Sequence, residues 1–240
     1  MILAIDAGNT RIKWGMHDGT RWTAGGAVAN SDVVRLHDAW KVMPAPLKVV
    51  VSNVAGELIR SEVTVLLARW RVAPQWVVAT ANQCGVVSHY ENPAQLGCDR
   101  WAALIGARHL HSGPAVVVMG GTAMTVDALT GDGRFLGGLI LPGLSLMAES
   151  LSLKTAGIRV EHGKAQTFPT NTRDAVWSGA LLASAGAIDR MRQALEGAGE
   201  ANPTVLLSGG TAEELEPLVQ GPCRRVDNLV LEGLARIALS

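Results

Sequence analysis

Three short turns in this chain combine glycine with small hydrogen-bonding side chains, and each follows an apolar run typical of a buried strand. The first turn joins the run Ile2–Ile5 to a second strand-like run, Arg11–Met16. The turn and its neighbours are Asp6, Ala7, Gly8, Asn9, Thr10, Arg11, Ile12 and Lys13. Gly8 permits a positive φ and a close approach of backbone N–H groups to an anion, Lys13 can add positive charge, and Asp6 can hold Mg²⁺. The pattern favours a phosphate-binding hairpin, and an ordinary Gly-Asn turn with an exposed aspartate is the alternative.

The same pattern recurs about half a chain later and again near the end. The run Val116–Met119 leads into the turn Gly120–Thr122 and then into an alternating strand. A third turn, Ser208–Thr211, follows the apolar run Val205–Leu207. In order, these three turns resemble the two phosphate loops and the adenosine loop of the superfamily that contains actin, sugar kinases and heat-shock ATPases. The resemblance implies an ATP-dependent phosphotransferase.

Composition narrows the possible functions. The 240 residues are 48% apolar, and 21 Lys and Arg balance 21 Asp and Glu, so the formal net charge is zero. Without a basic excess, nucleic acid is not expected as a partner. No apolar stretch approaches the ~18–20 residues that span a bilayer, so no membrane contact is expected. The N-terminal run has no basic region before it and is interrupted by Asp6, so we expect no signal peptide.

The three cysteines, Cys84, Cys98 and Cys223, are odd in number and share no Cys-x-x-Cys spacing. This pattern indicates neither a disulfide framework nor a zinc site. A reducing, cytoplasmic location is therefore expected.

The hydrophobic pattern predicts an α/β protein in which the order of elements in residues 1–113 begins again in residues 114–240. This order resembles the ribonuclease-H-like halves of the same superfamily, which implies two duplicated domains with an ATP cleft between them. Each domain is expected to carry a mixed five-stranded sheet. The strands predicted in the first half are Ile2–Ile5, Arg11–Met16, Arg21–Val28, Lys48–Ser52 and Gln75–Ala79, with helices from Ser31–Asp32 to about Trp40, over Glu57–Arg71 and over Trp101–His111. The strands predicted in the second half are Ala115–Met119, Thr122–Leu129, Arg134–Leu141, Thr204–Leu207 and a short one to Val226, with helices over Ser145–Leu153, Thr172–Glu196, Ala212–Val219 and Leu229–Leu239.

A segment from Tyr90 to Trp101 connects the two halves and carries two adjacent charged residues, Asp99 and Arg100. If the glycine turns hold ATP, Asp99 could take a proton from an acceptor hydroxyl, and Arg100 could steady the acceptor or the phosphoryl group. The alternative is a helix-capping aspartate beside a surface arginine.

Five ordered motifs together resemble the type III pantothenate kinase family over nearly the whole chain. They are Asp-x-Gly-Asn-Thr at Asp6–Thr10, Asn-Pro-x-x-Leu-Gly-x-Asp-Arg at Asn92–Arg100, Gly-Thr-Ala-x-Thr-x-Asp at Gly121–Asp127, Gly-Gly-x-Ile-x-Pro-Gly at Gly137–Gly143 and Thr-x-x-Ala-x-x-x-Gly at Thr172–Gly179. The resemblance implies transfer of the ATP γ-phosphoryl group to the primary hydroxyl of pantothenate, which is the first step of coenzyme A synthesis.

The resemblance also assigns roles to residues. It implies that the segment from Asp6 to Lys13 forms the first phosphate loop, with Thr122 also contacting ATP and Asp99 acting as the general base. Pantothenate would be surrounded by Tyr90, Gly97, Cys98, Asp99 and Arg100, and by Thr172 from the second subunit of a homodimer. Asp6 and Asp127 are the candidate ligands of Mg²⁺.

One position departs from the family pattern. Members usually carry an aspartate two residues before the Gly-Thr pair, where it binds K⁺ or NH₄⁺, and in this chain that residue is Met119. A thioether is a poor ligand for a hard cation that prefers oxygen. Three explanations are open: cation dependence is lost or weakened, another group substitutes, or the chain is a catalytically silent nucleotide-binding relative with a regulatory or accessory role. A kinase for another small hydroxyl compound is a further alternative.

Overall fold

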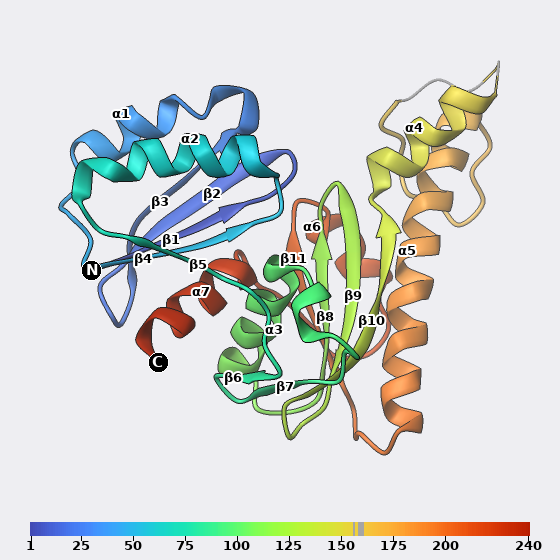
Figure 1. Ribbon diagram of the computed structural model, residues 1–240. Coiled ribbons are helices and arrows are strands. Elements are labelled where there is room, and N and C mark those ends of the chain that lie inside the picture. Colours follow the sequence, from blue (N-terminus) through green and yellow to red (C-terminus); the bar gives the residue numbers. More distant parts are fainter. Residues whose placement is uncertain (156, 158–160) are drawn as a thin grey trace. The chain divides into compact units, whose positions relative to one another are not determined.

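The chain forms two compact units. The computed structural model describes residues 1–155, 157 and 161–240 (Figure 1). By its internal contacts the first unit comprises Met1–Leu110 and Asn228–Ser240, and the second comprises His111–Asp227. The predicted division between residues 113 and 114 lies three residues after the boundary between Leu110 and His111. It differs at the C-terminus, because Asn228–Ser240 makes its contacts within the first unit.

The first unit is built on a five-stranded mixed sheet with the strand order β3-β2-β1-β4-β5. Its strands are β1 (Ile2–Ala7), β2 (Arg11–His17), β3 (Trp22–Ala29), β4 (Lys48–Asn53) and β5 (Pro74–Trp76). The first three strands form an antiparallel meander, and β4 and β5 continue the sheet in parallel from β1. This confirms the mixed sheet that the sequence predicts for this half.

Side chains along each strand point alternately to the two faces of the sheet, and those on one face form a buried core. Leu3 and Ile5 of β1 pack with Val49 and Val51 of β4. On the same face lie α1 (Arg35–Lys41) and α2 (Glu57–Leu67), side by side over the sheet (Figure 1). They contribute Leu36, Trp40, Ile59, Val63 and Leu67, which recur at helical spacing. Short 3₁₀ helices, Asn30–Asp32 before α1 and Ala68–Trp70 after α2, replace the ends of the longer helices that the sequence predicts.

Two helices pack against each other elsewhere in the first unit: α3 (Cys98–Leu110) and the terminal helix α7 (Leu229–Leu239). Their backbones approach closely at two glycines, since a Cβ atom at Gly106 would meet the Leu229 carbonyl and one at Gly233 would meet the Ala102 carbonyl. α7 also contacts β1 and β4. Lys48 Nζ donates to the Ala238 carbonyl oxygen at 2.6 Å. The last helix of the chain is therefore an integral part of the first unit.

The second sheet has seven strands in the order β12-β11-β8-β9-β10-β7-β6. Its strands are β6 (Asn82–Gln83), β7 (Val86–Ser88), β8 (Ala115–Gly120), β9 (Ala123–Leu129), β10 (Arg134–Pro142), β11 (Thr204–Gly209) and β12 (Cys223–Arg225). The order β12-β11-β8-β9-β10 within this sheet corresponds to the order β5-β4-β1-β2-β3 of the first sheet. This repetition confirms the predicted duplication. The prediction of five strands is wrong here, because the two short strands β6 and β7 extend the sheet beyond β10.

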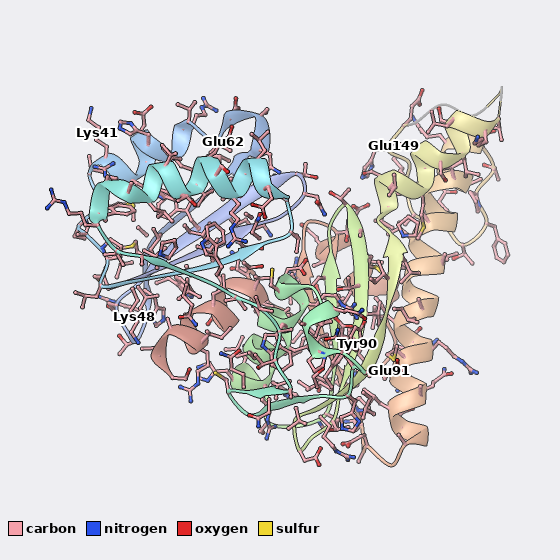
Figure 2. The ribbon with its side chains drawn as sticks, in the orientation of Figure 1. Lys41, Lys48, Glu62, Tyr90, Glu91 and Glu149 are labelled. Atoms are coloured by element: carbon pink, nitrogen blue, oxygen red, sulfur yellow. The ribbon has the colours of Figure 1, made fainter. Side chains whose placement is uncertain are left out.

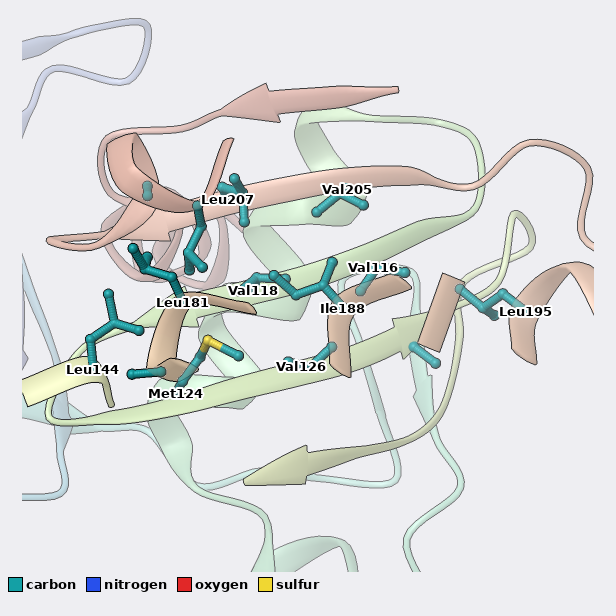
Figure 3. Packing of buried hydrophobic residues seen from close by; sticks show 14 of the residues in the cluster. Val116, Val118, Met124, Val126, Leu144, Leu181, Ile188, Leu195, Val205 and Leu207 are labelled. Carbon is teal, nitrogen blue, oxygen red and sulfur yellow. The ribbon is translucent and has the colours of Figure 1, made fainter. Parts of the chain in front are cut away.

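The long helix α5 (Thr172–Gly197) packs on this sheet within the second unit (Figure 3). Leu181, Ile188 and Leu195 recur every seven residues and meet Val116, Val118, Met124, Val126, Val205 and Leu207 of the strands. α4 (Leu144–Lys154) follows β10, and α6 (Ala212–Leu215) is a single turn that continues as a 3₁₀ helix, Glu216–Leu218. In the part of the chain that the structure describes, no helix is long and apolar enough to cross a membrane.

Candidate active site

The first glycine turn closes the β1–β2 hairpin as predicted. Asp6 is paired with Lys13 and Ala7 with Ile12 in the antiparallel register, and the Gly8 N–H donates to the Arg11 carbonyl oxygen at 3.1 Å. Gly8 does not have a positive φ, so the turn does not use the conformational freedom that glycine permits there. Glycine is needed here for space, because a Cβ atom would lie 3.3 Å from the Arg11 oxygen.

Asn30, which the sequence analysis did not single out, holds the carbonyl side of this turn. Its side-chain Nδ2 donates to the Gly8 oxygen at 2.9 Å and to the Asn9 oxygen at 3.0 Å, and its backbone N–H donates to the Thr10 oxygen at 3.1 Å. The meander explains the contact, because β3 returns antiparallel to β2 and ends opposite Arg11. No local motif marks the residue; only the strand pairing brings it to the turn.

Asp6 lies at the end of β1 in an environment unfavourable to its charge. Burial raises the pKa of Asp6 to about 7, the positive charge of Lys13 opposes this shift, and the negative charge of Asp99 adds to it. Strand register pairs Asp6 with Lys13 and with Ser52. Ser52 Oγ lies 3.3 Å from Sγ of Cys98, the residue before Asp99. The structure therefore brings Asp6 and Lys13 close to the segment that carries Asp99. Two carboxylates near one ammonium group favour binding of a further cation, and oxygen ligands suit Mg²⁺.

Asp99 is the second residue of α3 and is half-buried. Its Oδ1 atom accepts a hydrogen bond from the Arg100 backbone N–H at 2.8 Å. A Cβ atom at residue 97 would lie 2.6 Å from this oxygen, so Gly97 leaves the room that the carboxylate occupies. The carboxylate is thus held at the first turn of the helix while remaining partly accessible to a substrate.

The neighbouring side chains form a second layer around Asp99. Arg100 is buried, with 5% of its surface exposed, and its Nη1 donates to the Tyr90 hydroxyl at 3.0 Å. Cys98 Sγ lies 3.3 Å from Ser52 Oγ and 3.5 Å from the Asn53 carbonyl oxygen. Burial raises the pKa of the Cys98 thiol, which suits the predicted packing role rather than that of a nucleophile.

Ser52 connects this cluster to the strand that leads into the first glycine turn. It lies on β4 directly beside Asp6 in the parallel register, and it is completely buried. The sequence places Ser52 and Asn53 at the end of a buried strand, but nothing in the sequence assigns them a role. The carboxyl ends of β1 and β4 thus meet the beginning of α3, where ligands of open α/β sheets commonly bind.

In the second unit, Thr122 lies exposed in the turn between β8 and β9. Its carbonyl oxygen accepts a hydrogen bond from the Gly143 N–H at 2.9 Å. A Cβ atom at Gly143 would meet the Gly121 carbonyl, so the last glycine of the Gly-Gly-x-Ile-x-Pro-Gly motif allows this close approach. Two of the sequence motifs therefore meet at one turn.

Met119 lies in a row of side chains across three strands. Its register partners are Thr125 on β9 and Ser208 on β11. Thr125 Oγ1 is buried and has no hydrogen-bond partner among the described residues, and Ser208 Oγ donates to the Asp227 carbonyl oxygen at 3.5 Å. The row offers two hydroxyls and a thioether but no carboxylate at the position of Met119, so it does not fit the cation site implied by the family.

Asp127 is fully buried within the sheet, paired with Val117 on β8 and Gly138 on β10. It is five residues beyond Thr122, which corresponds to about 17 Å along an extended strand. The structure therefore does not place Asp127 beside the glycine turn of its own unit. Among the residues that the structure describes, no group of three or more His, Cys, Asp or Glu side chains could hold a metal ion.

The third glycine turn lines a hollow of about 460 Å³ at the ends of β11 and β12. Its lining residues are Gly209, Gly210, Ala212, Glu213, Arg225, Val226 and Asp227. Gly209 has a φ of 101°, and a Cβ atom there would meet the Gly120 carbonyl. The absence of a side chain at Gly209 thus lets the backbones of the second and third turns approach each other at the same end of the strands.

Thr172 is exposed at the first position of α5, next to a tightly bonded loop. The buried Asp174 accepts hydrogen bonds from the Lys164 N–H at 2.9 Å and from Asn171 Nδ2 at 2.8 Å. These bonds hold the pKa of Asp174 below its usual range. The end of the helix that carries Thr172 is therefore fixed in place by its own unit.

Comparison with known proteins shows the family to which the sequence belongs. The family model for type III pantothenate kinase matches residues 2–194. The chain is 48% identical to a type III pantothenate kinase of Nitrosospira multiformis, over 99% of this chain and 91% of the relative.

Solved structures share the fold at low sequence identity. A Campylobacter jejuni protein assigned to the Baf family of transcriptional activators has a TM-score of 0.62 at 20% identity, covering 99% of this chain and 97% of the other. A Sinorhizobium meliloti protein assigned as a 2-dehydro-3-deoxygalactonokinase has a TM-score of 0.60 at 16% identity, covering 99% and 98%. These two likenesses concern the fold alone, whereas the family match extends over most of the sequence. The chain belongs to the type III pantothenate kinase family.

Proposed function

We propose that this protein transfers the γ-phosphoryl group of ATP to the primary hydroxyl of pantothenate, giving 4′-phosphopantothenate for coenzyme A synthesis. The observation that carries the proposal is the grouping of Asp6, Lys13 and Asp99, supported by the pairing of Asp6 with Lys13 and Ser52 in the sheet and by the contact of Ser52 with Cys98, the neighbour of Asp99. Family membership supplies the substrates.

The phosphates of ATP are assigned to the turn from Asp6 to Lys13. Backbone N–H groups of a glycine turn and a lysine ammonium are suited to polyphosphate. Asp6 is the residue that would hold Mg²⁺, which neutralises charge on the phosphates when it is bound. Since the pKa of Asp6 is about 7, its carboxylate becomes the prevailing form only above neutrality unless a cation is present.

The acceptor is assigned to the beginning of α3. Asp99 takes the proton from the pantothenate hydroxyl as the hydroxyl oxygen attacks the γ-phosphorus, and the bond from that phosphorus to the β,γ-bridging oxygen breaks to release ADP. Gly97 leaves the room that the Asp99 carboxylate needs. Arg100, Tyr90 and Cys98 line the acceptor side, with Arg100 oriented by its hydrogen bond to Tyr90. Most of the rate enhancement is expected from positioning and charge, because phosphoryl transfer needs little covalent help from the protein.

The second unit is assigned to the rest of the nucleotide. Thr122 would contact ATP, and the hollow beside Ser208 and Gly209 has room for a nucleoside. Glu213 and Asp227 in its lining are acceptors suited to ribose hydroxyls, and Arg225 can stack on a base. Asp127 is buried in β9, five residues along the strand from Thr122, so Asp6 is preferred as the Mg²⁺ residue of the proposal.

We propose further that turnover does not require K⁺ or NH₄⁺. The support is the thioether of Met119 at the position of the family's carboxylate, next to an unpartnered hydroxyl of Thr125 among the described residues. The same observation favours the second candidate function, a catalytically silent relative that binds nucleotide without turnover and serves a regulatory role. The intact Asp6, Lys13 and Asp99 favour the kinase.

We also propose that the protein works as a cytoplasmic homodimer, in which Thr172 of one copy reaches pantothenate bound to the other. Apolar side chains exposed near α4 and α5 support this proposal. They are Leu146, Leu151, Leu153, Phe168 and Leu182. Such a concentration of exposed apolar side chains is typical of an interface.

The test is detection of 4′-phosphopantothenate by mass spectrometry after incubation of the purified protein with MgATP and pantothenate. One reaction contains K⁺ and a parallel one contains Na⁺ in its place. Equal product in both buffers is the expected result. Product only with K⁺ would contradict cation independence, and no product from protein that binds ATP would favour the silent relative.

A further inference from the structure

The geometry points to Asn30 as a positioning residue that aims the phosphate loop at ATP. This inference rests on the proposed function, since it assumes that the turn after β1 binds the phosphates. Asn30 itself need not touch the nucleotide. It acts on the backbone of Gly8, Asn9 and Thr10, whose carbonyl oxygens all accept hydrogen bonds from this one residue.

The hydrogen bonds to the carbonyl oxygens also fix the direction of the N–H groups in the same peptide units. In a trans peptide the C=O of one residue and the N–H of the next point in opposite directions. The described chain contains no cis peptide bond. Because Asn30 Nδ2 holds the oxygens of Gly8 and Asn9, the N–H groups of Asn9 and Thr10 are directed away from Asn30. Adjacent N–H groups fixed in this way form an anion-binding concavity.

The amide of Asn30 is used only as a donor. Its Nδ2 gives hydrogen bonds to two carbonyl oxygens, whereas its Oδ1 is buried and has no partner among the described residues. A buried acceptor without a partner lowers stability, so the residue is not optimised for folding alone. The role of the side chain therefore lies in the two hydrogen bonds that Nδ2 donates. Aspartate has nearly the same shape but cannot donate when ionised, so Asn30→Asp tests these two bonds most directly.

The same meander provides a matched control at its other turn. Asp18 Oδ1 accepts hydrogen bonds from the Thr20 N–H at 2.8 Å and from the Arg21 N–H at 2.9 Å, between β2 and β3. Asp18 thus organises a turn through two main-chain contacts, as Asn30 does, but at the opposite end of β2. Asp18→Ala removes a comparable number of hydrogen bonds without altering the phosphate loop.

The experiment compares Asn30→Asp, Asn30→Ala and Asp18→Ala in the full chain. Titrations measure binding of MgATP, inorganic tripolyphosphate and adenosine, and steady-state assays give KM for each substrate. Loss of two neutral hydrogen bonds that orient the loop predicts affinity for MgATP and tripolyphosphate about 10- to 100-fold weaker in both Asn30 variants. Affinity for adenosine and KM for pantothenate should stay unchanged. Asp18→Ala should lower the unfolding temperature but leave all three affinities unaltered.

Unchanged affinity for both polyphosphate ligands in folded Asn30→Asp would overturn the inference while leaving the kinase assignment intact. Equal weakening for adenosine would also overturn it, because a general loss of structure affects every ligand. Wild-type protein that binds neither MgATP nor tripolyphosphate would instead refute the proposed function and, with it, the role of Asn30. Amide hydrogen exchange of residues 8–11, compared between the Asn30 variants and Asp18→Ala, verifies that the change in mobility is local.

Discussion

Asp6 combines a role in the proposed site with an environment that opposes its ionised form. It is held in the register beside Lys13 and Ser52, yet burial dominates over the attraction of Lys13 and raises its pKa to about 7. A carboxylate kept in such surroundings lowers stability unless something binds it. The Asp6 carboxylate therefore lowers the stability of the fold while serving the proposed site, and a substitution at this residue can separate the two effects.

Asp6→Asn is expected to abolish turnover and to stabilise the protein above pH 7. The pKa of Asp6 is higher in the folded state, about 7 against 3.8, so wild-type stability falls as pH rises from about 4 to 7 and stays low above that range. The gain at pH 8 is on the order of 2–4 kcal/mol, since each pKa unit is worth about 1.4 kcal/mol. Below pH 4 this contribution disappears.

Urea unfolding at pH 5 and pH 8 without Mg²⁺ measures this difference. Glu62→Gln, a change at an exposed carboxylate (Figure 2), is the control and should not alter the pH dependence. A gain of equal size at both pH values would show that the effect does not come from the Asp6 charge.

Asp99→Asn tests the proton acceptor. Loss of a positioned general base predicts a kcat about 10²- to 10⁴-fold lower. Binding of ATP should change little, because the amide keeps the shape and retains an oxygen that can accept from the Arg100 N–H. Calorimetric titration with ATP and the phosphopantothenate assay separate the two effects. A variant with wild-type turnover would remove Asp99 from the mechanism.

Met119→Asp tests the cation site. The new carboxylate would lie between Thr125 and Ser208 in the register, which adds the charged oxygen ligand that the row lacks. Product formation by the variant is expected to rise with K⁺ and to stay low in Na⁺, whereas wild-type activity should be equal in both. If neither protein responds to K⁺, the thioether of Met119 is not the reason for cation independence.

At the scale of elements, the contact between α3 and α7 supports the acceptor site, because Asp99 lies in the first turn of α3. Gly233→Ala would drive a methyl group into the Ala102 carbonyl. Overpacking of this kind costs about 1–3 kcal/mol or more, since two helix backbones must separate. Gly186→Ala is the matched control: this exposed glycine of α5 has nothing within 4 Å of a Cβ atom, so the change should stabilise by about 0.5–1 kcal/mol. Thermal unfolding distinguishes the two, and equal effects would contradict the packing argument.

Long elements with clear periodicity were predictable from the sequence, and short ones were not. The helix Leu229–Leu239 and the paired strands on either side of Gly8 match the structure because local patterns determine them. The strands β6 and β7 are two and three residues long, too short for alternation to be recognised.

The same limit applies to the site. Asp6, Lys13 and Asp99 belong to motifs, whereas Asn30 and Ser52 reach the site through strand pairing between distant segments. Contacts of this kind depend on the completed sheet, so no local pattern reveals them.

At the scale of the whole molecule, the first unit depends on residues from both ends of the chain. A protein that ends at Asp227 lacks the buried side chains Leu229, Val230, Leu231, Leu234 and Ile237. Burial of each is worth about 1.5–3 kcal/mol, and the total is comparable with the stability of a typical domain. We expect the first unit to unfold, with loss of turnover, while the second unit stays folded.

Hydrogen exchange followed by mass spectrometry tests this expectation. Amides of β1 and β4 should exchange rapidly in the truncated chain, whereas those of β8 and β11 should stay protected. Removal of the exposed Ser240 alone is the control and should leave both sheets protected. Protection of β1 in the longer truncation would show that α7 is dispensable.

Because residues 228–240 belong to the first unit, folding of that unit during protein synthesis depends on when α7 is translated. Residues 1–110 leave the ribosome before the second unit, but their partner helix α7 is translated only after it. The second unit is a continuous stretch, so it can fold while the first still lacks α7. Emergence of α7 from the ribosome exit tunnel would then be the event that completes the proposed phosphate and acceptor sites. The enzyme would thus gain its activity only after α7 has been translated and has packed on the first unit.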